Sequence, residues 1–270
     1  MRPVVLLIAT SCLALAQAPN TLTPAEKSAG WKLLFDGKSL KGWQPPAPAT
    51  WGIEDGCLKS LDKPVLREDL ISTGTYGDFE LAFEWKVAPG ANSGVKYKIQ
   101  DAVLVDEHQL PNKMPFEQQV AYFLKNRSAK KELVKGGSGA QVYPVAFEYQ
   151  VIDDSKHADA IKNPSSRAGS LYRMAAASQA AAKPVGEFNQ SRIVLRGKHV
   201  QHFLNGVQVV EIDLDAPQVR ASIEERWSAD NPVRELLAKM PKTLTPIAIQ
   251  HHNDVAWYRN VKIRPLSAAK

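Results

Sequence analysis

The chain has 270 residues, of which 44% are hydrophobic and 23% are charged, close to the average of a soluble globular protein. This composition excludes a wholly disordered chain, a collagen-like repeat, a multi-span membrane protein and a miniprotein held together by disulfides. Lys and Arg outnumber Asp and Glu by 34 to 28, a net charge of +6, and the basic residues are spread along the chain. Nucleic-acid binding therefore has little support, because it requires a concentrated basic surface.

The N-terminal segment, residues 1–16, is predicted to be a secretory signal peptide. It has a positively charged start and an apolar run too short for a transmembrane helix, and Ala14-Leu15-Ala16 offers small residues for signal peptidase. We expect a mature chain that begins at Gln17 and is periplasmic or secreted in a bacterium, without a membrane span. Lipoprotein anchoring at Cys12 is the alternative. Cleavage would leave Cys57 as the single cysteine, so no internal disulfide is expected.

The mature chain is predicted to contain a polar N-terminal tether, residues 17–30, and one domain over residues 31–266. Residues 79–87 alternate strictly between apolar and polar side chains, which indicates a half-buried antiparallel strand. The Asn205-Gly206 pair indicates a type I′ hairpin turn. Further strands are expected at residues 94–100, 147–152, 191–196, 200–204, 207–212, 247–250 and 257–263. Many short strands with few helices predict an all-β, two-sheet antiparallel sandwich.

Two segments interrupt the strand pattern and are predicted to carry the helices. The first lies in a long insertion, from about residue 101 to residue 144, where apolar residues recur at helical spacing after Pro115. The second, residues 217–240, places apolar residues four apart and is interrupted at Asn231-Pro232. We expect helices in these two segments alone.

Seven short motifs follow one another in an order that is similar to a known family. They are Asn92-Ser93-Gly94-Val95, residues 148–157, Ala168-Gly169-Ser170-Leu171-Tyr172, residues 186–194, residues 202–206, Ile249-Gln250-His251-His252 and residues 257–261. In this order they resemble the family once called domain of unknown function 1080 and now described as 3-keto-disaccharide hydrolase or 3-keto-glucoside 1,2-lyase. The resemblance extends over roughly residues 30–266.

The resemblance implies a concanavalin-like jelly roll that acts on glycosides or oligosaccharides already oxidised to a ketone at carbon 3. The insertion at 101–144 is longer than expected for the family and would reshape the rim of the substrate groove. A ketone at carbon 3 acidifies the hydrogen on carbon 2, so the glycosidic bond can break by proton removal and elimination, with or without later hydration. Such an enzyme needs a general base, an acid for the leaving oxygen and donors that stabilise an enolate.

Glu148 is the predicted carboxylate of this site. On its strand Glu148 and Gln150 share one face, while Tyr149 and Val151 share the other. If the apolar pair faces the core between the sheets, Glu148 and Gln150 point into the groove. A solvated strand carboxylate is the plain alternative. The chain lacks the Glu-x-Asp-x-Glu strand of ordinary laminarinase-type glycosidases.

Three histidines complete the predicted catalytic group. His157 follows the strand of Glu148, and His252 takes the groove side of the His251-His252 pair because adjacent strand residues point to opposite faces. His202 alternates with apolar neighbours, so a hydrogen-bonded core histidine competes there with a catalytic one. Around Glu148 and these histidines we expect five substrate-binding residues: Lys96, Gln150, Tyr172, Asn189 and Gln250.

The spacing of the histidines does not by itself argue for a metal site, since His-x-His and His-x-x-x-His patterns are absent and adjacent histidines on a strand do not share an ion; a metal ion stays an open alternative. Nucleotide-binding and serine-hydrolase motifs are absent too, so no cofactor is predicted. The alternatives to the enolate mechanism are a non-catalytic, lectin-like carbohydrate-binding module on the same fold and an ordinary glycoside hydrolase.

Overall fold

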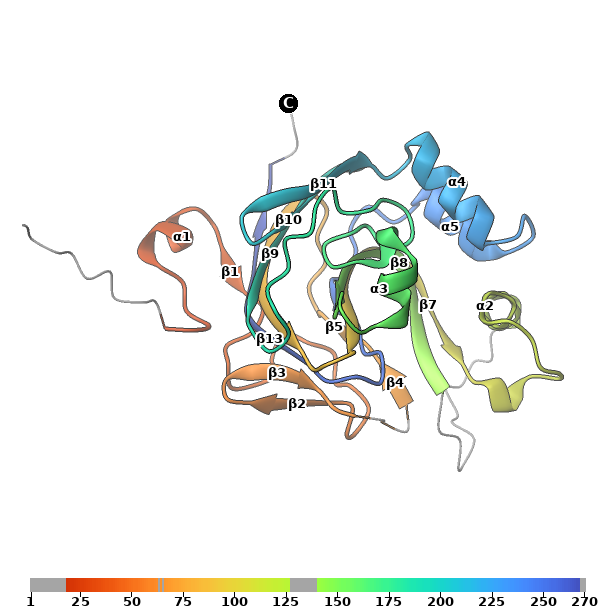
Figure 1. The fold of residues 1–270 in the computed structure, drawn as a ribbon, viewed down its shortest axis with the longest axis horizontal. Coiled ribbons are helices and arrows are strands. Elements are labelled where there is room, and N and C mark those ends of the chain that lie inside the picture. Colours follow the sequence, from red (N-terminus) through yellow and green to blue (C-terminus); the bar gives the residue numbers. More distant parts are fainter. Residues whose placement is uncertain (1–17, 63, 65, 127–139, 268–270) are drawn as a thin grey trace, which may run out of the picture.

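The computed structural model describes residues 18–62, 64, 66–126 and 140–267, so the predicted signal peptide lies outside the described residues. Two sheets pack face to face, and helices cover the outer side of one of them (Figure 1). The architecture is the jelly-roll sandwich that the sequence predicts. Within the described ranges, no helix is long and apolar enough to cross a membrane.

The larger sheet has eight strands and forms the left-hand layer in Figure 1. In spatial order they are β11 (Val207–Asp213), β10 (His199–Leu204), β9 (Asn189–Arg196), β6 (Phe79–Val87), β13 (Ala256–Pro265), β3 (Cys57–Ser60) and β2 (Trp51–Glu54), with β1 (Lys32–Leu33) beside β13. All of its strand pairs are antiparallel.

The smaller sheet has five strands and carries the candidate site. Their order is β4 (Leu66–Glu68), β8 (Ala140–Ile152), β7 (Asn92–Val105), β12 (Ala248–Ile249) and β5 (Leu70–Ile71). The long pair β7 and β8 is antiparallel, whereas β4 joins β8 in parallel at the edge. The predicted purely antiparallel sandwich is therefore correct except at this edge strand.

Among the described residues, five α-helices connect or cover the strands. They are α1 (Pro24–Ser28), α2 (Phe116–Lys125), α3 (Ala158–Lys162), α4 (Pro217–Arg226) and α5 (Pro232–Lys239), and two single 3₁₀ turns lie at η1 (Glu107–Gln109) and η2 (Pro164–Ser166). Helices α2 and α5 pack on β7 and β8, and α4 packs on α5 (Figure 1). The outer face of the smaller sheet is therefore enclosed rather than open to solvent.

The alternation along β8 decides which side chains enter the core and which face the helices. Phe147, Tyr149 and Val151 are fully buried between the sheets, where the Tyr149 ring contacts Phe83 edge to face. The Tyr149 hydroxyl lies 2.8 Å from the hydroxyl of Ser191 on β9, which satisfies its polar atom inside the core. The intervening Glu148 consequently projects to the opposite, helix-covered face.

The predicted elements agree with the structure where the pattern is local. Strand β6 has the predicted bounds, and Asn205 and Gly206 have φ of +49° and +84°, as a type I′ turn requires. Helices α1 and α3 lie outside the two segments predicted to hold all helices, so that restriction is wrong. The described residues of the insertion, 101–126 and 140–144, also hold strand residues, because β7 and β8 both extend into it on either side of α2.

Candidate active site

A cavity of about 240 Å³ lies on the outer face of the smaller sheet. Residues of β7 and β8, of the loop after β12 and of the helices line it. Its polar lining residues are Arg67, Asp69, Asn92, Lys96, Gln141, Tyr143, Glu148, Tyr172, Arg226, Gln250, His251 and His252. Carboxylates, cations and amides thus meet in a space small enough to exclude much of the solvent. A site of this kind strengthens every electrostatic interaction inside it.

Glu148 lines the cavity and lies directly across the ladder from Lys96 on β7. Glu148 is only 8% exposed, and Gln250 Nε2 donates a hydrogen bond to Glu148 Oε2 at 3.2 Å. Burial raises the pKa of Glu148 to about 7, although nearby positive charge, first that of Lys96, acts against this rise. A carboxyl group that titrates near neutral pH can take and return a proton during a reaction.

Gly94 leaves the space that the Glu148 carboxyl occupies. A Cβ at position 94 would lie 2.3 Å from Glu148 Oε1, closer than any two such atoms can approach. The glycine therefore serves a steric purpose within the strand. It permits a buried carboxyl group to lie flat against the sheet.

Lys96 is held by a second buried carboxylate, that of Asp69. Lys96 Nζ lies 2.7 Å from Asp69 Oδ2, and both side chains are about 95% buried. Burial lowers the pKa of Lys96, but the charges of Asp69 and Glu148 outweigh burial and hold the pKa above its ordinary value. Asp69 Oδ1 also accepts from the backbone N–H of His251 at 3.0 Å. The cavity therefore contains a fixed cation beside a carboxyl of nearly neutral pKa.

Arg226 and Tyr172 close the cavity on the helix side. The guanidinium group of Arg226, at the end of α4, lies 5.8 Å from the Tyr172 ring, and its Nε lies 3.2 Å from Glu117 Oε1. Burial raises the pKa of Tyr172 to about 12, so its hydroxyl stays protonated and donates to Asp159 Oδ2 at 3.1 Å. Arg226 adds a second positive charge to the field at Glu148.

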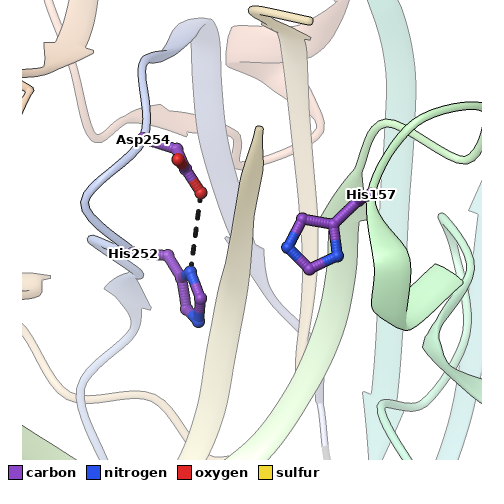
Figure 2. Close-up of side chains that lie close together, drawn as sticks. All are labelled: His157, His252 and Asp254. Carbon is purple, nitrogen blue, oxygen red and sulfur yellow. Dashed lines mark ion pairs between the residues drawn. The ribbon is translucent and has the colours of Figure 1, made fainter. Parts of the chain in front are cut away.

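His157 and His252 come together at the rim, as the sequence predicts. His252 lines the cavity, and the His157 ring lies with its centroid 6.3 Å from that of His252. His252 Nδ1 is 3.5 Å from Asp254 Oδ2, and His157 faces this pair from the loop before α3 (Figure 2). His252 thus lines the cavity that contains Glu148, and His157 lies next to His252.

His202 does not join this group, and its predicted place beside Glu148 is wrong. His202 is fully buried between the sheets. Its Nδ1 lies 2.9 Å from the Gly169 carbonyl oxygen, and its Nε2 lies 2.9 Å from the Tyr97 hydroxyl oxygen. Burial lowers the pKa of His202 to about 4, so the ring is neutral. The alternative of a hydrogen-bonded core histidine is correct, because His202 alternates with apolar residues whose side chains enter the core.

Two predicted substrate-binding residues have other partners. Asn189 Oδ1 accepts from the Lys183 amide and from Asn205 Nδ2, both at 2.8 Å, and the residue does not line the cavity. Gln150 is buried on the predicted face, but its Nε2 donates to Asn92 Oδ1 at 3.1 Å instead of reaching the cavity. Asn189 therefore holds a turn, and Gln150 positions Asn92.

The remaining predicted substrate-binding residues, Lys96, Tyr172 and Gln250, all line the cavity. Sequence reasoning missed Asp69, Arg67 and Arg226. Asp69 lies between two strands of only three and two residues, and Arg226 ends a helix far along the chain. None of these positions carries a local pattern that would separate it from a surface charge.

The chain is similar to known carbohydrate-active proteins. Residues 30–264 match a family model described as the 3-keto-alpha-glucoside-1,2-lyase-like domain. A Bacteroides thetaiotaomicron protein named 3-keto-disaccharide hydrolase is 30% identical over 259 residues, which cover 88% of this chain and 79% of the relative.

Two solved structures from Parabacteroides distasonis, both with a provisional glycosyl hydrolase assignment, have the same fold. The first has a TM-score of 0.67 at 23% identity, and the match covers 93% of this chain and 100% of the chain in that structure. The second has a TM-score of 0.57 at 24% identity and covers 87% of this chain and 99% of its own. At these identities the two structures establish the fold alone.

Proposed function

Since the chain belongs to the 3-keto-alpha-glucoside-1,2-lyase-like domain family, we propose that it cleaves the glycosidic bond of glycosides or disaccharides oxidised at carbon 3. The observation that carries the proposal is the buried carboxyl of Glu148, whose pKa of about 7 suits a general base. The name of the Bacteroides thetaiotaomicron relative supports the same substrate class.

In the proposed reaction the Glu148 carboxylate removes the proton from carbon 2. The electron pair of that C–H bond forms an enolate with the carbon-3 ketone, and collapse of the enolate expels the oxygen on carbon 1. The products are a 3-keto sugar with a double bond between carbons 1 and 2, and the released alcohol once its oxygen gains a proton. Addition of water to the double bond would make the net reaction a hydrolysis.

Two cations are available for the negative charge that develops on the carbon-3 oxygen. The Lys96 ammonium is fixed by Asp69, and Arg226 also lines the cavity. Preorganised positive charge in a closed site stabilises an enolate without reorganisation during the reaction. Gln250 Oε1 and Arg67 Nε, both buried without a hydrogen-bond partner among the described residues, supply polar contacts for sugar hydroxyls.

His252 and His157 belong to the leaving-group side of the proposed reaction. His252 lines the same cavity as Glu148, and His157 lies beside His252, next to the residues that line the cavity. Because these are different side chains, proton removal at carbon 2 and assistance to the oxygen on carbon 1 can be carried out by different groups. The groups that act as base and acid are thereby kept apart.

The carboxylates of the cavity favour this mechanism over ordinary glycoside hydrolysis. An ordinary glycosidase places two carboxyl groups on either side of the glycosidic bond. Here Asp69 and Glu148 are the carboxylates that line the cavity in the described chain, and Asp69 is neutralised by Lys96. A lectin-like module would have no use for a buried carboxyl group with a raised pKa, because keeping it costs stability.

Aglycone release from a 3-keto-glucoside and from its unoxidised parent tests this proposal. The wild-type protein should cleave the ketone substrate alone, and Glu148→Gln should lower turnover by about two to four orders of magnitude. Glu80→Gln is the matched control, because Glu80 is also a buried strand glutamate but pairs with Arg192 on the other sheet. Equal cleavage of both substrates, or full activity of Glu148→Gln, would exclude the proposed mechanism.

We also propose that the protein is exported, because residues 1–16 have the sequence features of a signal peptide. Intact-mass analysis of protein recovered outside the cytoplasm should give a chain that starts near Gln17. Retention of Met1 would contradict export by this signal, and a diacylglyceryl mass on Cys12 would identify a lipoprotein instead.

A further inference from the structure

Three side chains with metal-ligand chemistry meet at the rim of the cavity. His157 comes from the loop before α3, and His252 and Asp254 come from the loop between β12 and β13 (Figure 2). One ligand atom from each lies within 4.8 Å of the others, and all three residues are partly exposed. Sequence spacing did not reveal this group, because almost 100 residues separate His157 from the other two.

The distances are close to those of a coordination sphere. Two ligand atoms on a tetrahedral ion with bonds of about 2.0–2.2 Å lie about 3.3–3.6 Å apart. His252 Nδ1 and Asp254 Oδ2, at 3.5 Å, already have this separation, which is too long for a good hydrogen bond. The ligand nitrogen of His157 lies within 4.8 Å of the other two ligand atoms, so a small inward movement of this ring would complete the group.

Outer contacts orient the carboxylate and the second histidine. Asp254 Oδ2 accepts from the backbone N–H of Asn92 at 3.0 Å, and the Asp254 carbonyl accepts from Ser60 Oγ at 2.7 Å. His157 Nδ1 accepts from the Asp159 amide at 3.2 Å, which directs Nε2 toward His252 and Asp254 (Figure 2). A metal ion at Nε2 would require the ring proton on Nδ1, so His157 would give up its hydrogen bond from the Asp159 amide on binding.

We propose that His157, His252 and Asp254 bind one divalent transition-metal ion through two imidazole nitrogens and one carboxylate oxygen. Two nitrogen donors favour zinc and its neighbours in the first transition row over calcium and magnesium, which prefer oxygen. Three protein ligands leave at least one position open, as in catalytic rather than structural zinc sites. The chemical class of the ligand is therefore a zinc-like ion that can also bind a substrate or water oxygen.

The ion would also act on the leaving group in place of the histidines themselves. This role rests on the proposed function. His252 lines the cavity that contains Glu148, so an ion held by His252 would lie beside the space proposed for the sugar. There the ion would act as a Lewis acid on the carbon-1 oxygen, or polarise the water that adds to carbon 1. Ion binding itself does not depend on this role.

Zinc binding to the full-length mature chain tests the site, by titration calorimetry and by metal analysis after dialysis. The wild-type protein should bind one zinc ion per chain, and magnesium should not displace it. His157→Ala, His252→Ala and Asp254→Asn should each weaken binding by at least about tenfold, since even the loss of an outer contact has that effect. His199→Ala is the matched control, because His199 is an exposed histidine on β10 that pairs with Asp213 and Glu211.

No stoichiometric zinc binding by the wild-type protein, or equal binding by the three variants and the control, would overturn the site. Unchanged thermal unfolding of the variants would show that any loss of binding is local. Glu148→Gln separates the two proposals, because it should lose turnover and retain zinc. Turnover by wild-type protein that binds no zinc would remove the metal site alone, and zinc binding without turnover of a 3-keto-glycoside would remove the proposed function alone.

Discussion

Glu148→Gln should stabilise the protein at pH 8 and leave its stability almost unchanged near pH 5. The pKa of Glu148 rises from its ordinary value of 4.5 to about 7 on folding, so the folded state holds a proton that the unfolded state releases. This contribution to stability is complete below pH 4.5 and is lost as the pH rises through 7. Glutamine has the same shape and cannot ionise, so it avoids this loss.

The size of the effect follows from the pKa change. A rise from 4.5 to about 7 corresponds to about 3 kcal/mol between the two protonation states. Solvent screening changes this little, because Glu148 is only 8% exposed. The Lys96 cation keeps Asp69 as a partner at 2.7 Å, so neutralising Glu148 does not leave a buried charge unpaired. We therefore expect a gain of up to about 3 kcal/mol at pH 8.

Urea unfolding of both proteins at pH 5 and pH 8, followed by tryptophan fluorescence, measures this difference. Glu80→Gln should behave in the opposite way and lose stability at both pH values. Burial raises the pKa of Glu80, but hydrogen bonds from Arg192 and Arg264 outweigh it and hold that pKa below its ordinary value. A stability difference between Glu148→Gln and wild type that does not grow with pH would refute the assignment of a raised pKa.

Three substitutions test other parts of the structure. Lys96→Met leaves Asp69 buried without its cation, so unfolding experiments should show a loss of about 3–5 kcal/mol and the aglycone assay a loss of turnover. Gly94→Ala should lower turnover by about 100-fold, since its methyl group would displace the Glu148 carboxyl; unchanged turnover would contradict that crowding. His202→Ala should lower the free energy of unfolding, measured in urea, by about 2–4 kcal/mol and leave the activity per folded molecule unchanged. A fully folded variant without activity would show that His202 takes part in the reaction.

Local patterns predict much of the fold. The strict alternation of residues 79–87 gives the bounds of β6, because one face of that strand packs on the core. The short strands β4 and β5 have too few residues to show a period, and their place in the sheet depends on contacts with β8 and β12. The extension of β7 and β8 into the insertion also depends on each strand having the other as a partner.

The candidate site is less predictable, because its residues meet only in the folded chain. Glu148 could be placed from the phase of its own strand. Asp69 could not, because its role depends on an ion pair with Lys96, a residue of another segment of the chain. His202 shows the converse case, in which a histidine among family-like motifs has a strand phase that directs it to the core.

The rate of cleavage of a 3-keto-glucoside that carries deuterium at carbon 2 tests the central claim most directly. If Glu148 removes the carbon-2 proton in the step that limits the rate, the deuterated substrate should react more slowly than the ordinary one. With unlabelled substrate, kcat/KM should rise as the pH passes through about 7, because the base must be ionised. Equal rates for the two substrates, together with cleavage of the unoxidised parent glucoside, would contradict elimination through an enolate.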